Sequence, residues 1–190
     1  MKMNNFNYDT FEKYSGTSDH KSYKIIKEAI KTSDEIGSIL RTHLYFEKIL
    51  ESWIYSVCNQ ENFFKDTQLG FYTKLKIALN LGLPAEVSDI ASRLNKIRNS
   101  IAHNVTTDRS GIDTKLLEGL KDSFKDKIIQ RFPGWQEGSV GMSFLDEDGE
   151  KISVIWNDPN LKTHELLAVI CQLTITYLFF SIFQMPSKAT

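Results

Sequence analysis

Apolar residues recur at steps of three and four along most of the chain, which is the spacing of one face of an α-helix. The pattern predicts helices over residues 19–31, 34–58, 71–80, 84–103 and 113–131, and a final helix that begins near residue 161. The helix over 34–58 has the broadest apolar face and the final helix is the most apolar. We therefore expect these two helices to form the centre of an all-α helical bundle.

Two parts of the chain depart from this pattern. Short strand-like segments at 140–145 and 151–156 flank an acidic run (Asp-Glu-Asp-Gly) at 146–149, and Asp-Gly is a typical hairpin turn. The sequence thus predicts a small β-hairpin inserted at about residues 138–157, before the C-terminal helix. Residues 1–18, rich in Asn, Ser, Thr and Gly, are expected to form a flexible N-terminal arm, which leaves 19–190 as a single helical domain.

The final helix also raises the question of a membrane span. Residues 166–183 contain no charged side chain, and their length is near the lower limit of about 17–25 residues for a transmembrane helix. Four polar residues interrupt the segment, and few basic residues flank it: only Lys188 follows it. We expect a buried core helix rather than a tail anchor. The N-terminal residues lack the apolar core of a secretory signal, so we expect a cytoplasmic protein.

Composition limits the classes of function. The chain has 190 residues, a hydrophobic content of 41% and a formal net charge of −1, with a pI near 6.4. Domains that hold nucleic acid by bulk charge usually have a pI above about 9, so a sequence-independent coat protein is excluded, whereas a local basic site is not. The sequence lacks HExxH, a glycine-rich phosphate loop and a GxSxG elbow, and we expect no cofactor and no metal.

One stretch carries candidate chemistry, at residues 96–104. It places Arg98, Asn99 and His103 near the end of an amphipathic helix. Asn99 and His103 are four residues apart and share a face, whereas Arg98 lies about 140° from His103 around the helix. A second copy of the helix across a two-fold axis is one way to bring these groups together.

The residue types suit cleavage of RNA without a metal. Histidine exchanges a proton near neutral pH, arginine binds phosphate oxygens, and asparagine orients either group. A base that removes the proton of a ribose 2′-OH lets that oxygen attack the adjacent phosphate. Polar residues at a helix end are also ordinary, and a histidine in the last turn interacts favourably with the helix dipole. The spacing alone therefore fits both a functional site and a purely structural helix end.

The stretch resembles the motif of the HEPN superfamily, in which arginine is followed by four to six residues and then histidine. The run 40–53 looks like the long helix that precedes this motif. The segment 71–83 (FYTKLKIALNLGL) is similar to the branch related to the mannitol operon repressor. The likeness spans residues 34–105. It implies an all-α bundle, homodimers with the motifs facing each other, and metal-independent ribonuclease activity, often in toxins or phage defence. His103 would then be the acid/base, Arg98 the phosphate clamp and Asn99 its helper.

Two further residues and several partners complete the hypothesis. His43 and Glu47 lie four apart on the preceding helix, where they either support the motif or belong to a solvated face. Near-neutral charge favours a small RNA target such as tRNA, and we expect a homodimer, with an antitoxin or regulatory protein as a further partner. The main alternative is a non-catalytic HEPN-like regulator, antitoxin or immunity module that binds protein, nucleotide or RNA. A tail-anchored membrane protein is the third hypothesis.

Overall fold

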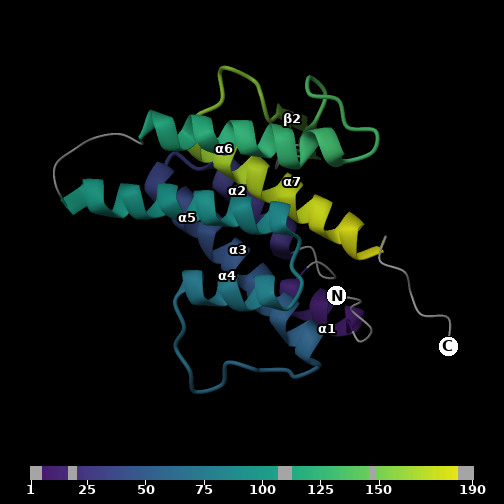
Figure 1. Cartoon of the computed structure of the whole chain (residues 1–190). Coiled ribbons are helices and arrows are strands. Elements are labelled where there is room, and N and C mark those ends of the chain that lie inside the picture. The colour runs from purple at the N-terminus through teal and green to yellow at the C-terminus, as the bar shows by residue number, and fades with distance from the viewer. Residues whose placement is uncertain (1–5, 17–20, 107–112, 146–148, 184–190) are drawn as a thin grey trace.

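The computed structural model describes residues 6–16, 21–106, 113–145 and 149–183 (Figure 1). This part of the chain is mostly helical, with one small antiparallel hairpin before the last helix. The elements in chain order are α1 (Tyr8–Ser15), α2 (Lys21–Lys31), α3 (Glu35–Cys58), α4 (Phe71–Asn80), α5 (Ala85–Thr106), α6 (Thr114–Lys127), the 3-10 turn η1 (Ile129–Arg131), β1 (Gly141–Leu145), β2 (Lys151–Ile155) and α7 (Thr163–Phe183). The helix positions predicted from periodicity are confirmed to within a few residues, and residues 129–131 continue α6 as a tighter turn.

The core is centred on α3 and α7, as expected. Trp53, Phe46 and Leu50 of α3 are fully buried, and so are Ile170 and Leu178 of α7. α3 begins where the Asp34 side chain accepts a hydrogen bond from the Gly37 amide. The two helices run side by side in the same direction, since their early residues Glu35 and His164 meet and so do the later Thr42 and Cys171.

α7 has no polar face because it is surrounded by other elements. It contacts α2, α3, α5 and β1. Among the described residues it is the one helix long and apolar enough to cross a membrane, with a mean hydropathy of 2.1 over a window that is 61% buried. A core helix of a soluble protein passes the same test, so this finding is weak evidence for a span.

The expectation of a flexible arm over residues 1–18 is wrong for residues 8–15, which form helix α1. The Asn7 side chain caps its first turn by accepting from the Thr10 amide, and Gly16 ends it in a left-handed conformation (φ +74°). Phe11 is 2% exposed and contacts Trp53 of α3 and Phe179 of α7. Phe11 is thus the main apolar anchor of α1, and Tyr8 and Tyr14 add ring contacts to Phe183 and Tyr55.

The predicted hairpin is confirmed. β1 pairs with β2 in antiparallel register from Gly141 opposite Ile155 to Leu145 opposite Lys151. Phe144 and Val154 are buried beneath it, so one face of the ribbon joins the core. Gly149 has a left-handed φ of +82°, in keeping with the Asp-Gly turn signal, whereas residues 146–148 of that turn lie outside the described residues.

Candidate functional site

The motif residues lie on the C-terminal half of α5. The helix buries a stripe toward the bundle: Val87, Ile90, Leu94, Ile97 and Ile101. α5 runs antiparallel to α4 and crosses α3 at an angle, and its C-terminal end extends past the neighbouring helices (Figure 1). Residues 95–103 therefore pass from a packed environment to an exposed helix end within about two turns.

Arg98 and Asn99 form one unit. The guanidinium Nη1 of Arg98 donates a hydrogen bond of 3.0 Å to Asn99 Oδ1. Both side chains are half-buried, and Arg98 Nε is buried without a hydrogen-bond partner among the described residues. Because Nε is shielded from solvent, the terminal N–H groups of Arg98 are the ones that could bind an anionic ligand.

His43 lies on the α3 side of this unit. Its Nε2 donates to Asn95 Oδ1 over 3.0 Å, and its ring lies 4.4 Å from the ring of Phe71. Burial is the main cause that lowers the pKa of His43, and the charge of Arg98 lowers it further, against the opposing influence of Asn95 and Glu47. His43 is therefore neutral at pH 7, and it links α3 to α5 at the level of Arg98.

Glu47 belongs to a different interaction. Lys74 of α4 donates to Glu47 over 2.7 Å and to Glu51 over 2.5 Å, so both acids of α3 face α4. Burial alone would lower the pKa of Lys74, but its bonds to the two carboxylates outweigh this and raise it. The lysine is 12% exposed, so the group is an interhelical ion pair rather than a solvated face. This ion pair holds α4 against α3 near His43.

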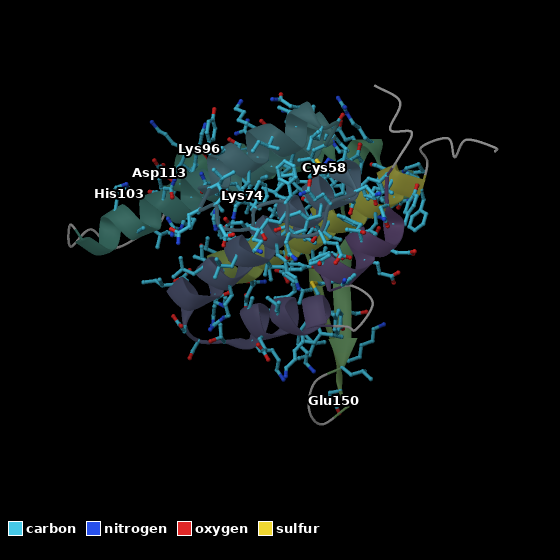
Figure 2. All side chains as sticks on the ribbon, turned by 90° about the horizontal axis from the view of Figure 1, so that it is seen from below. Cys58, Lys74, Lys96, His103, Asp113 and Glu150 are labelled. Atoms are coloured by element: carbon cyan, nitrogen blue, oxygen red, sulfur yellow. The ribbon has the colours of Figure 1, made fainter. Side chains whose placement is uncertain are left out.

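His103 is separated from Arg98. It is exposed at the end of α5, where Figure 2 shows it at the same extremity of the molecule as Asp113. The helix geometry that separates Arg98 and His103 by about 140° is maintained, because α5 continues regularly to Thr106. One chain thus places Asn95 and Arg98 near His43, and leaves His103 about 140° from Arg98 around α5.

The sequence prediction missed Asn95 and Lys74, which hold His43 and Glu47 in place. Asn95 precedes Asn99 by four residues on the same face, and this spacing is the one signal that could have indicated it. No group of three or more His, Cys, Asp or Glu side chains suited to a metal occurs within the described ranges. Comparisons with models of protein families, with curated proteins and with solved structures gave no match.

Proposed function

We propose that the protein is a metal-independent endoribonuclease of the HEPN type, a toxin or phage-defence effector that cleaves a specific RNA. The observation that carries the proposal is the Arg98–Asn99 pair, half-buried beside the projecting end of α5 that bears the exposed His103. In this role Arg98 binds the scissile phosphate and Asn99 holds the guanidinium. His103 takes the proton of the ribose 2′-OH.

The chemistry yields a defined product. As the 2′-oxygen bonds to phosphorus, the bond from phosphorus to the 5′-oxygen of the next nucleotide breaks, and this oxygen takes the proton that His103 removed from the 2′-OH. The upstream fragment then ends in a 2′,3′-cyclic phosphate and the downstream fragment in a 5′-hydroxyl. The charge of Arg98 offsets the charge that builds on the phosphate oxygens. DNA lacks the 2′-OH and is therefore not a substrate.

Because Arg98 and His103 point apart on one helix, the proposal needs a second copy of the chain. An apolar stripe on α3 supports such an arrangement: Ile36, Leu40 and Leu44 are 46%, 38% and 62% exposed. Asn95 of α5 bonds to His43, which directly precedes Leu44, so α5 passes α3 next to this stripe. A two-fold axis at this surface would bury the stripe and set Arg98 of one copy near His103 of the other.

The test is cleavage of total RNA by purified protein in the presence of EDTA, with sequencing of the fragments that end in a 2′,3′-cyclic phosphate. We expect His103→Ala and Arg98→Ala each to lower cleavage by about 100-fold or more, since removal of a general base or of a charge clamp has effects of this order. Lys24→Ala, an exposed substitution on α2, is the control and should cleave like the wild type. Cleavage retained in folded His103→Ala contradicts the proposal.

A second experiment tests the proposed two-fold dimer. Leu44→Lys should give a monomer in sedimentation and lose cleavage, because a charge in a buried apolar contact opposes association. Ile155→Lys, a matched change at an exposed apolar residue of β2, should leave both properties unchanged. A dimer that leaves all RNA intact would favour the non-catalytic regulator or antitoxin instead. The bond of Arg98 to Asn99 within one chain, with His103 about 140° from Arg98 around the helix, is the observation that supports this second candidate.

A further inference from the structure

The surface formed by α4 and the later part of α5 is more basic than the rest of the chain. Residues 71–80 and 90–106 contain no aspartate or glutamate, although the chain as a whole carries 24 acidic residues against 23 basic ones. Their basic residues are Lys74, Lys76, Arg93, Lys96 and Arg98. Lys74 and Arg93 form ion pairs with acids, whereas Lys76, Lys96 and Arg98 have no acidic partner within the described ranges. A local surface with free cations fits a polyanion.

The two helices meet at the level of the motif. Phe71, the first residue of α4, has its ring 4.4 Å from that of His43, and His43 bonds to Asn95 of α5. Because α4 and α5 run antiparallel (Figure 1), the first turn of α4 lies level with the turn of α5 from Asn95 to Asn99. α6 packs about 120° away around α5, at Asp89.

The arc of α5 between these two contacts is polar and open to solvent. It carries Lys96, Asn99 and His103, which fall within about 60° of one another around the helix. Lys96 and His103 are exposed and Asn99 is half-buried, and Figure 2 shows Lys96 and His103 on the same side of the molecule. Seven residues separate Lys96 from His103, which is about 10 Å along the helix. A polyanionic chain that lies along this arc therefore reaches both residues.

An exposed aromatic ring lies beside this arc, on α4. Tyr72 follows Phe71 and is 58% exposed, and among the described side chains of α4 and α5 it is the one large apolar group that is exposed. Nζ of Lys76 lies over the ring, 5.2 Å from its centroid. The lysine covers one face of the ring, and the high exposure leaves the other face for a flat group.

A single exposed ring among free cations narrows the polyanion. An anionic membrane surface or a protein interface requires several apolar side chains in one patch. Single-stranded nucleic acid instead takes cations for its phosphates and aromatic rings on which its unpaired bases stack. We infer that the α4–α5 surface binds single-stranded RNA, with a base on Tyr72 and flanking phosphates on Lys76 and Lys96. That the strand is RNA rests on the proposed ribonuclease function, whereas the binding itself does not.

The test uses a strand that can be bound but not cleaved. The probe is a fluorescent RNA of about 12 nucleotides with every 2′-hydroxyl methylated, and fluorescence anisotropy measures its affinity. Tyr72→Leu keeps an apolar side chain and removes the ring, so it should weaken binding by about tenfold, whereas Tyr72→Phe should bind like the wild type. Phe183→Leu, the same loss of a ring at a 74% exposed residue of α7, is the control and should have no effect.

A duplex probe separates stacking from charge. When the same strand is annealed to its complement, its bases are paired and cannot stack on Tyr72. We expect the duplex to bind more weakly than the single strand, and Tyr72→Leu to leave the affinity for the duplex unchanged.

The salt dependence of binding tests the lysines separately. Each phosphate contact to a single strand contributes about 0.7 to the slope of log affinity against log salt concentration. Lys76→Gln and Lys96→Gln should therefore each reduce this slope by about 0.7. Lys24→Gln, at an exposed lysine of α2, is the control and should leave it unchanged. Tyr72→Leu should lower the affinity without changing the slope.

The outcomes distinguish this inference from the proposed ribonuclease. Equal affinity of folded Tyr72→Leu and wild type for the single strand would overturn the inference, and so would a salt slope that neither lysine changes. Binding that depends on Tyr72, with unmethylated RNA left intact, would support the surface and refute the ribonuclease. RNA cleavage that is unaltered in Tyr72→Leu would support the ribonuclease and overturn the surface.

Discussion

The two halves of α5 have contrasting surroundings. In the first half, Val87, Ile90 and Ala91 are fully buried, and Asp89 accepts hydrogen bonds from Arg93 of the same helix and Ser123 of α6. In the second half the helix end projects past its neighbours, and His103 is exposed (Figure 1). The first half attaches the helix to the bundle, and the second presents the motif. Changes in the first half should therefore reduce stability, and changes in the second should affect chemistry.

The largest expected effect compares two isoleucines of α5. Ile90→Ala should reduce the free energy of unfolding by about 3 kcal/mol, because Ile90 is fully buried and the cavity has no way to fill. Ile101→Ala, near the projecting end and 9% exposed, should cost roughly half as much, because fewer atoms surround it. Urea denaturation of both variants measures the difference. Equal losses would mean that the second half is packed as firmly as the first.

The next largest expected effect is a pH dependence of the free energy of unfolding that arises from Asp89. Burial alone would raise its pKa, but hydrogen bonds from Ser123, Arg93 and Lys127 outweigh burial and lower the pKa to about 2. Because the folded-state pKa lies below the usual 3.8, the stabilisation is complete above pH 3.8 and is lost as the pH falls toward 2. With allowance for the partial exposure of Asp89, we expect its carboxylate to contribute about 1–2 kcal/mol to the free energy of unfolding.

Unfolding by urea between pH 2 and pH 5 tests this effect in wild type and Asp89→Asn. The variant should be less stable near pH 5 and converge with the wild type near pH 2. Asp122→Asn, at an exposed acid on α6, is the control and should follow the wild-type curve at all pH values. An unchanged slope in Asp89→Asn would show that the three donors do not act on this carboxylate in solution.

The sequence predicted the large elements because burial follows periodicity in them. The stripe of α5 and the broad face of α3 both carry enough apolar residues to show their period. The sequence did not predict α1 because Phe11 is the main apolar residue that this helix buries, and a helical repeat needs several apolar residues to be visible. Its caps, Asn7 and Gly16, are the signal for a helix here, but Asn and Gly are equally typical of loops.

The site was predicted in its local geometry and missed in its long-range contacts. The separation of Arg98 and His103 follows from helix geometry alone, so the sequence was sufficient to predict it. The bond from His43 to Asn95 joins residues 52 positions apart and depends on how two helices cross, which no local spacing gives.

The smallest expected effect is on the pKa of His43, and it tests whether Arg98 in the second half of α5 acts on this residue of α3. Burial lowers the pKa of His43 below the usual 6.5, and the charge of Arg98 contributes to that lowering. Neutral His43 therefore supports the fold above pH 6.5, and this support is lost as the pH falls. Arg98→Met removes the charge and keeps an apolar stem, so the pKa of His43 should rise in an NMR titration of the imidazole. His103→Ala should leave that pKa unchanged, since His103 is exposed on another face. If His103→Ala shifted it and Arg98→Met did not, then His103, and not Arg98, would be the residue of α5 that acts on His43, and the separation of the two motif residues within one chain would be refuted.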